Sequence, residues 1–203
     1  MKFHYMIFTL FFILFRVGHC IGFADKDIFG ELNFGIGEIA SKDKESSFKL
    51  TKNSFTADAR FIILPINLGI GYRYETDEGT KTINEFYNDY YSFVRHSLLL
   101  NYRIINNSFY LGPVFTYGLS HDLTVNSNQL NSTFGPTPLK VRSSYTLSLE
   151  SGFHWNIFLL GIDVGARKII LDSSNTTIET FGKVTLGMQS LFIGKLIGTP
   201  GLW

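Results

Sequence analysis

The chain has 203 residues, of which 45% are hydrophobic, 16% are aromatic and only 17% are charged. Soluble domains carry about 25% charged residues, so this composition is typical of a membrane protein and excludes a disordered chain. The formal net charge of +1 provides no basic surface for nucleic acid. The single cysteine, Cys20, excludes an internal disulfide framework and a thiolate metal cluster. The length predicts one domain, with room for a processed leader.

The first 24 residues have the pattern of a secretory signal peptide. Lys2 precedes an apolar run from Tyr5 to Phe15, which is shorter than the about 20 residues that a membrane-spanning helix needs. Small residues at Gly22 and Ala24 predict cleavage after Ala24, so the mature chain is expected to begin at residue 25. The alternative is a lipoprotein anchored at Cys20, although a histidine stands where such a signal needs a small residue.

Further along the chain, apolar and polar residues alternate with period two, which predicts half-buried β-strands. No apolar run there reaches 18 residues, and a membrane protein without spanning helices must be a closed β-barrel. The alternation is found in eight segments: 31–37, 55–61, 67–74, 97–104, 109–120, 142–153, 160–167 and 183–189.

The segments between the predicted strands alternate between short and long. Tight turns are expected at 64–67, 105–108 and 154–156, and longer polar stretches at 41–54, 75–92, 121–141 and 170–178. The sequence therefore predicts an all-β fold, an eight-stranded antiparallel transmembrane β-barrel with short periplasmic turns and four long extracellular loops. The barrel is expected to occupy residues 25–189, and residues 190–203 are either the end of the last strand or a periplasmic tail.

Alternation alone does not decide which face of the barrel points inward, and a soluble lipocalin-like barrel also alternates. The polar face carries many glycines, which suit a crowded eight-stranded interior. It also carries charges of both signs, which predict a charge network in the lumen. The predicted network consists of Glu31, Asp58, Glu150 and Asp163 with Arg60, Arg73, Arg103, Arg142, Arg167 and Lys183.

With this pattern, residues 25 to about 189 resemble the small eight-stranded outer-membrane barrels of the OmpX/OmpA type. Length, leader and residue usage are also similar to small porin-like surface proteins of spirochaetes. That resemblance implies pore formation or binding of host proteins such as complement factor H or laminin. It places the protein in the bacterial outer membrane, in contact with outer-membrane lipid and with its loops at the cell surface.

Two polar stretches hold candidate functional residues. Residues 75–92 combine acids with aromatic side chains that suit a protein partner, although tyrosines also form membrane-interface girdles. The binding candidates in this stretch are Glu85, Phe86, Tyr87, Asp89, Tyr90 and Tyr91. In the second stretch, 121–141, His121 is a further loop candidate for partner binding. It lies between Ser120 and Asp122, but three adjacent residues rarely converge as a catalytic triad. No histidine pair has metal-ligand spacing, so no metal or cofactor is expected.

The expected function is therefore display of surface loops that bind host or other extracellular proteins, without enzymatic activity and without nucleic acid. One alternative is a small porin-like channel through the lumen. Another is a lipid-modifying barrel enzyme that uses His121.

Overall fold

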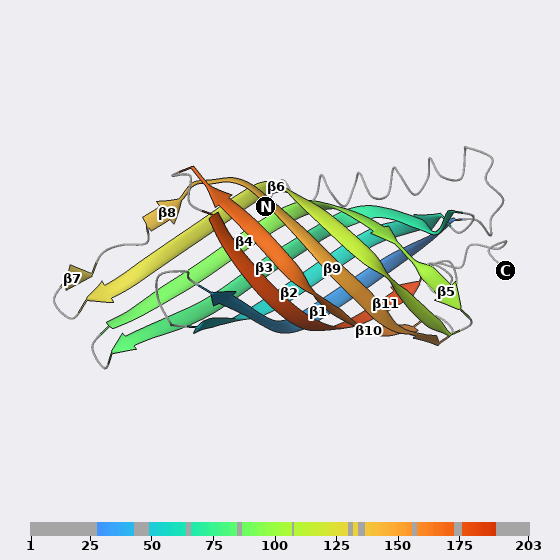
Figure 1. Cartoon of the computed structure of the whole chain (residues 1–203), viewed down its shortest axis with the longest axis horizontal. Coiled ribbons are helices and arrows are strands. Elements are labelled where there is room, and N and C mark those ends of the chain that lie inside the picture. The colour runs from blue at the N-terminus through green and yellow to red at the C-terminus, as the bar shows by residue number, and fades with distance from the viewer. Residues whose placement is uncertain are drawn as a thin grey trace, which may run out of the picture.

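The computed structural model is an antiparallel sheet that closes on itself (Figure 1). It describes residues 28–42, 49–63, 66–84, 87–106, 108–129, 132–133, 137–155, 158–172 and 176–189. The predicted signal peptide, residues 1–24, and residues 190–203 lie outside the described residues. Among the described residues, no helix is long and apolar enough to cross a membrane.

Eight long strands follow one another around the barrel in chain order, and pairing of β1 with β11 closes it. Strand β5 continues β4 and pairs with β6, and the short strands β7 and β8 also pair with β6. Each of the eight long strands contains most of one alternating segment, and segment 97–104 continues from β4 into β5, so the predicted fold class is confirmed. The strands are β1 (Ile28–Lys42), β2 (Lys49–Ile63), β3 (Leu68–Asn84), β4 (Tyr87–Tyr102), β5 (Ile104–Asn106), β6 (Phe109–Gln129), β7 (Ser132–Thr133), β8 (Thr137–Leu139), β9 (Val141–Trp155), β10 (Phe158–Leu171) and β11 (Thr176–Gln189).

The two ends of the barrel differ. At one end β2 and β3 are joined by a tight turn in which Asn67 has a φ of 54°, a left-handed conformation that asparagine tolerates. The backbone N–H of Arg103 donates to the carbonyl oxygen of Asn67 at 2.8 Å and fixes this turn to the neighbouring strand. Short turns mark the periplasmic end of outer-membrane barrels, so the opposite end is extracellular.

The strands continue well past the segments that the alternation marked. They contain 14 to 21 residues, whereas a tilted transmembrane strand needs about 9–11. Most of the excess lies at the extracellular end, where β3 runs to Asn84 and β4 starts at Tyr87. The prediction of a long loop over 75–92 was therefore wrong, because residues 75–84 and 87–92 lie on two paired strands.

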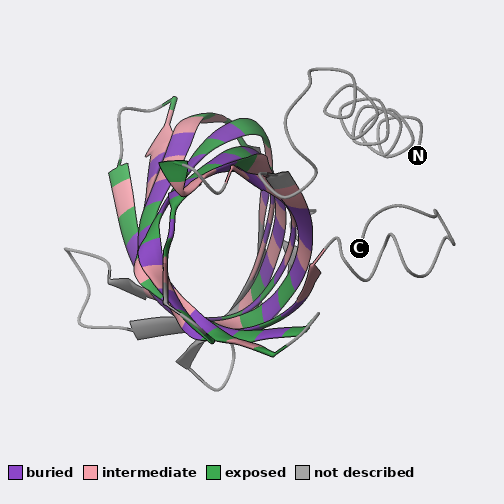
Figure 2. Ribbon diagram, turned by 90° about the vertical axis from the view of Figure 1, so that its right-hand side faces the viewer, coloured by how far each residue is buried: buried purple, intermediate pink, exposed green. Residues whose placement is uncertain are grey.

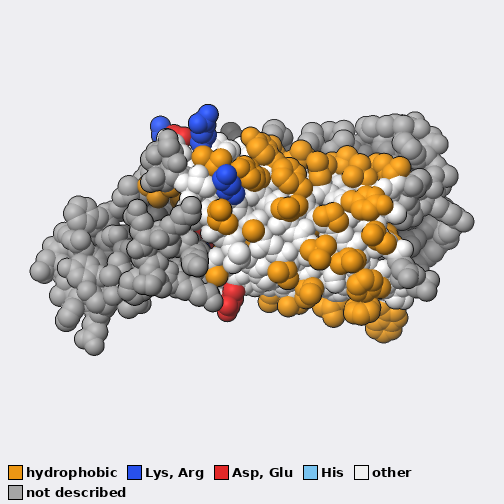
Figure 3. All heavy atoms as spheres, viewed as in Figure 1, with side chains coloured by type: hydrophobic (Ala, Val, Ile, Leu, Met, Phe, Trp, Pro, Cys, Tyr) orange, Lys and Arg blue, Asp and Glu red, His pale blue; other side chains and the backbone are white. Residues whose placement is uncertain are grey.

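The apolar face of every long strand points outward. Figure 2 shows buried and exposed residues alternating along the strands, and Figure 3 shows hydrophobic side chains spread over the outer wall in a broad band. The exposed apolar residues include Phe34, Ile36, Leu98, Phe115, Leu147, Leu149, Leu160, Ile162, Val164, Val184 and Leu186. An outer wall of this kind needs lipid as its solvent, so the membrane barrel is confirmed against the soluble alternative.

Aromatic residues gather on the outer wall near the periplasmic turns. Trp155 is 82% exposed, and Phe153 packs edge-on against Phe109 with ring centroids 5.6 Å apart. Aromatic rings prefer the boundary between lipid tails and headgroups. These residues therefore mark the periplasmic margin of the apolar band.

Candidate functional site

The lumen of the barrel is filled with charged side chains of both signs. Among the described residues, seven bases and seven acids are buried inside, so their formal charges cancel. The bases are Lys52, Arg60, Arg73, Arg95, Arg103, Arg167 and Lys183, and the acids are Glu31, Asp58, Glu75, Asp77, Glu150, Asp163 and Glu179. A buried charge is tolerated only when it is paired and hydrogen-bonded. The positions of these side chains are therefore fixed by their partners.

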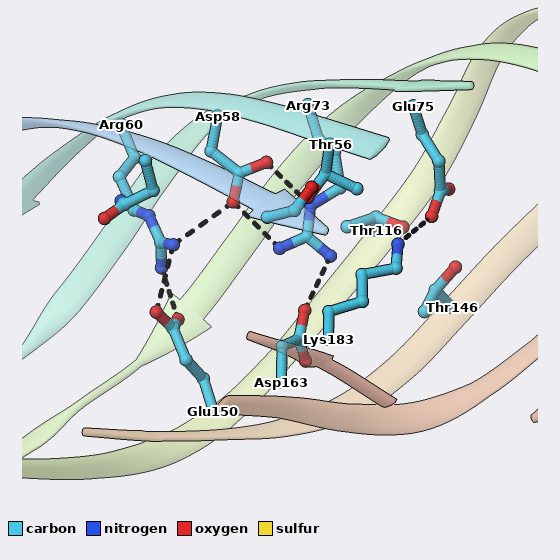
Figure 4. A network of polar contacts seen from close by, with 12 residues as sticks. Thr56, Asp58, Arg60, Arg73, Glu75, Thr116, Thr146, Glu150, Asp163 and Lys183 are labelled. Atoms are coloured by element: carbon cyan, nitrogen blue, oxygen red, sulfur yellow. Dashed lines mark hydrogen bonds and ion pairs between the residues drawn. The ribbon is translucent and has the colours of Figure 1, made fainter. Parts of the chain in front are cut away.

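Arg60 is the centre of the periplasmic half of this network (Figure 4). Its Nη1 donates to Glu150 Oε2 at 2.6 Å and its Nη2 to Asp58 Oδ2 at 3.2 Å. Its Nε lies 3.6 Å from Glu31 Oε2. One guanidinium from β2 thus holds together carboxylates from β1, β2 and β9, because its fork of donors serves several acceptors at once.

Two further arginines complete the periplasmic cluster. Arg73 donates through Nε to Asp58 Oδ1 at 2.7 Å and through Nη1 to Asp163 Oδ2 at 3.0 Å. Arg103 donates to Glu31 and, at 3.3 Å, to Glu150 Oε1. Three bases and four acids therefore give this cluster a net charge of −1 (3 − 4).

Arg167 has the corresponding place in the extracellular half. Its guanidinium contacts Asp77 Oδ2 at 2.6 Å and Glu75 Oε2 at 3.2 Å, and its Nε donates to Glu179 Oε2 at 2.9 Å. Lys52 also donates to Glu179.

Glu75 is the acceptor that joins the rest of the extracellular cluster. It accepts from Lys183, and its Oε2 lies 3.1 Å from Arg95 Nη2. Arg95 Nη2 also donates to the hydroxyls of Thr116 at 2.6 Å and Thr146 at 2.8 Å. With Lys52, Arg95, Arg167 and Lys183 against Glu75, Asp77 and Glu179, this cluster has a net charge of +1 (4 − 3).

Within the described part of the chain, no ion pair joins the two clusters. They meet where Asp163 and Lys183 are register partners on β10 and β11. Asp163 nevertheless pairs with Arg73, and Lys183 pairs with Glu75. The lumen thus contains two separately paired units of opposite net charge along its axis.

Nine of the ten predicted lumen residues lie in these clusters, and Arg142 does not. Its side chain is exposed, because the register between β9 and β10 shifts between Ile170 and Leu171 and leaves Arg142 as the extra residue. Such a bulge reverses the direction of the following side chains. The sequence analysis assumed that strict alternation continues through residue 142, so the prediction that Arg142 lies in the lumen was wrong.

Five lumen residues were missed by the sequence analysis. Lys52, Glu75, Asp77, Arg95 and Glu179 all lie on strand extensions that were interpreted as loops or fell outside the marked segments. A signal for two of them was available. The inward parity of β3 through Arg73 continues without a break to Glu75 and Asp77.

Apolar side chains also line the lumen beside the periplasmic cluster. Ile62, Leu99 and Leu159 point inward and are at most 1% exposed. Tyr110 lies beside them with its ring 4.2 Å from the Arg103 guanidinium carbon. Its hydroxyl would be only 2.6 Å from a Cβ added at its register partner Gly152, so glycine is needed there for the tyrosine to lie along the inner wall.

A second apolar group covers the charges on the extracellular side. Phe93, Leu123 and Ile169 form a buried cluster, with Val141 and Leu171 packed against it. The Arg167 guanidinium carbon lies 4.7 Å from the centroid of the Phe93 ring, which joins this layer to the charges beneath it. All fourteen lumen charges are at most 5% exposed.

We expect refolded protein in planar lipid bilayers to show no stepwise ion conductance. Among the described residues, the lumen charges are neutralised by one another and are at most 5% exposed. Single-channel recording checks this, with a porin of known conductance as the positive control. Reproducible steps that change when Arg60 is replaced would contradict it and favour the channel alternative.

His121 points into the barrel and not toward an external partner. At Leu119 a bulge on β6 lies opposite His96 and Ser97 of β4, and it changes the inward parity from even to odd residues. His121 Nε2 lies 2.7 Å from Ser144 Oγ, and its ring stacks on Phe93 at 6.2 Å. The expectation that His121 lies on an exposed binding loop was wrong.

The same geometry bears on the alternative of a lipid-modifying enzyme. Ser120 and Asp122 are exposed on the outer side while His121 points inward, so the three do not converge. The serine that His121 contacts, Ser144, is 0% exposed and is not accessible to an external substrate. Among the described residues, no group of three or more His, Cys, Asp or Glu side chains is placed to hold a metal ion.

The binding candidates of residues 85–91 divide into two groups. The Tyr91 ring lies 3.4 Å from Lys52 Nζ, and the tyrosine packs against the extracellular apolar cluster. It is therefore part of the barrel interior, and its prediction as a surface anchor was wrong. Tyr87, Asp89 and Tyr90 lie on β4, with their side chains outside the described set, and Glu85 and Phe86 lie outside the described residues.

No family model matches the chain, and no curated protein matches it. Among solved structures, the chain is similar to two crystal structures of Ail, the attachment invasion locus protein of Yersinia pestis, with TM-scores of 0.57 and 0.52. The sequence identities are 12% and 11%, over 80% and 79% of this chain and 99% and 97% of Ail. Neisserial surface protein A is also found, with a TM-score of 0.45, 13% identity and coverage of 81% and 96%.

The chain has the fold of a small outer-membrane β-barrel. The similarity to Ail confirms the predicted barrel type at the level of fold. The lipid-facing band and the closed sheet provide the physical reason for its location in a bacterial outer membrane.

Proposed function

We propose that the protein is a surface-binding protein that uses the extracellular extension of its strands to hold extracellular host proteins. The observation that carries this proposal is the set of strands that continues beyond the closed barrel. Figure 1 shows β3, β4 and β6 projecting together past the ends of the neighbouring strands. In these strands, residues 79–84 pair with β4, and β4 pairs with β6 as far as Asn128.

This projecting sheet has an edge that can accept another strand. Pairing between β2 and β3 ends at Asn53 and Glu78, and in the described part of the chain β3 beyond Glu78 pairs only with β4. Unpaired backbone N–H and C=O groups on such an edge are a template for an extended peptide of a partner. Tyr87, Asp89 and Tyr90 on the adjacent strand are the proposed side-chain contacts.

The lumen supports the same function indirectly. The lumen charges are paired and buried, and the apolar cluster of Phe93, Leu123 and Ile169 packs beside them. This packing supports a role as a scaffold more than a role as a channel. Rigid scaffolds with variable surface segments are a common arrangement for binding. Ail was crystallised with the heparin analogue sucrose octasulfate, and sulfated polysaccharide of host surfaces belongs among the probes for this chain.

Shortening the projecting sheet is expected to abolish partner binding without unfolding the barrel. Residues 80–90 are replaced by an Asn-Gly turn between Gly79 and Tyr91, and residues 126–136 by the same turn between Val125 and Thr137. Each pair consists of register partners, so a two-residue hairpin turn fits. Binding of the protein in lipid nanodiscs to immobilised laminin, factor H and heparin is measured by surface plasmon resonance.

The matched control replaces residues 43–48 by Asn-Gly between Lys42 and Lys49, which are also partners. We expect the wild type and this control to bind at least one of the three probes, and the shortened variant to lose more than tenfold in affinity. Equal binding by the shortened variant would overturn the role of the sheet. If the wild type binds none of the three probes, the result counts against the proposed function.

A further inference from the structure

The extracellular margin of the apolar band carries basic residues on one side of the barrel. Arg142 and Lys140 are exposed at the start of β9, and Lys168 is half-buried on the outer wall of β10. Figure 3 shows basic side chains, with an acidic one close by, at the end of the hydrophobic band on this face. These three residues are called the β9–β10 basic patch below.

Local backbone geometry produces this patch. The bulge between β9 and β10 turns Arg142 out of the lumen, next to Ile170 and Leu171. Lys168 is the register partner of Tyr145, and its Nζ lies 5.7 Å from the centroid of that ring. The backbone carbonyl of Lys140 accepts a hydrogen bond from Asp172 N–H at 3.1 Å, which holds this lysine to the end of β10.

The three bases of the patch outnumber the exposed acids close to them. Within 4.0 Å, none of its three bases forms an ion pair with a described residue, whereas all seven lumen bases do. Two exposed acids lie close to the patch: Asp172 at the end of β10, and Asp122 on β6, which precedes Leu123, the register partner of Leu139. At the extracellular end of other strands the exposed outward charges are acidic, at Glu38 on β1, two strands from β10, and at Glu78 on β3.

Directly below the patch the wall becomes apolar. Leu147 on β9 is 64% exposed and Val164 on β10 is 52% exposed, and both face the lipid. A cation at this level meets the phosphate layer, while the side chains below it meet acyl chains. Arginine and lysine in this position are attracted to anionic lipid, and the planar arginine fork suits a phosphate oxygen pair.

We propose that the β9–β10 basic patch binds the phosphate of an anionic outer-leaflet lipid whose acyl chains lie against Leu147 and Val164. Arg142 supplies paired N–H donors and Lys168 a second positive charge from the neighbouring strand. Lys140 adds attraction from above. This site is separate from the projecting sheet and does not depend on the proposed host-protein binding.

The test uses full-length mature protein reconstituted in phosphatidylcholine vesicles that contain spin-labelled lipid. Electron spin resonance measures the fraction of labelled lipid immobilised at the protein surface, separately for phosphatidylglycerol and phosphatidylcholine labels. We expect the wild type to prefer phosphatidylglycerol over phosphatidylcholine. In R142Q/K168Q the relative affinity for phosphatidylglycerol is expected to fall by about fivefold for each cation removed. An excess of inorganic phosphate is expected to leave the preference in place, because free phosphate lacks acyl chains.

The matched control is N53D, which lowers the net charge by one, as R142Q does, but at the exposed Asn53 of β2. Unheated gel migration verifies that each variant is folded. The proposal is overturned if the wild type shows no preference, or if N53D and R142Q reduce it equally, which would indicate a general charge effect. It is also overturned if inorganic phosphate removes the preference, which would indicate a free-phosphate site.

Discussion

Replacement of Arg60 by methionine is expected to lower the free energy of unfolding by about 3 to 5 kcal/mol. Arg60 is fully buried and contacts three carboxylates, at 2.6 Å from Glu150, 3.2 Å from Asp58 and 3.6 Å from Glu31. Methionine has similar length but no charge, so three acids lose a shared partner inside a low-dielectric lumen. The measurement is urea unfolding in lipid vesicles, followed by gel mobility and by tryptophan fluorescence.

The same substitution at Arg142 is the control for this experiment. Arg142 belongs to the same predicted set, but it is exposed and forms no ion pair with a described residue. Surface changes of this kind usually stay within about 0.5 kcal/mol. Equal effects at the two positions would contradict the division between lumen and outer wall, and so would a stable Arg60→Met barrel.

Introduction of arginine at Ile162 is expected to cost about 2 to 4 kcal/mol of stability in a bilayer. Ile162 is 51% exposed near the middle of β10, between Leu160 and Val164, which also face outward. An arginine there must place its charge in hydrocarbon or distort the bilayer to reach water. Unfolding of the variant from vesicles by urea gives the cost directly.

Asn53→Arg is the control, because Asn53 is exposed on the outer wall of β2 beyond the apolar residues of that strand. We expect it to change stability by less than about 0.5 kcal/mol. If both arginines are tolerated equally, the outer wall is not facing lipid at Ile162. If the Ile162 variant is destabilised equally in water-soluble form without lipid, the soluble barrel interpretation regains support.

The period of the sequence pattern was sufficient to predict the wall of the barrel. In a strand, neighbouring side chains point to opposite faces, so Leu160, Ile162 and Val164 on one parity and Gly161 and Asp163 on the other define two surfaces without knowledge of any partner strand. The closed sheet follows because lipid leaves no other way to satisfy the strand edges. The lumen residues that lie within the alternating segments were predictable for this reason, and on β3 these end at Arg73.

Strand length was not predictable in the same way. Beyond the membrane, outward positions such as Glu38 and Asn53 are polar while inward positions such as Ile39 are apolar, which is the reverse of the pattern in lipid. A search for strands whose outward residues are apolar therefore finds only the part of each strand that lies in the membrane. For the same reason Glu75 and Asp77 were assigned to a loop, and Tyr91 to a binding surface.

The sequence by itself determined that this chain forms an eight-stranded transmembrane barrel with charges of both signs inside, because burial in lipid acts on every second residue of a strand. Only the tertiary structure decided which charges pair, where the strands end and which way a residue points after a bulge. Arg142 and His121 show this most clearly. One extra residue on β9 and one on β6 reverse their directions, and bulges of this kind depend on the register of pairing with the neighbouring strand, which alternation along one strand does not show.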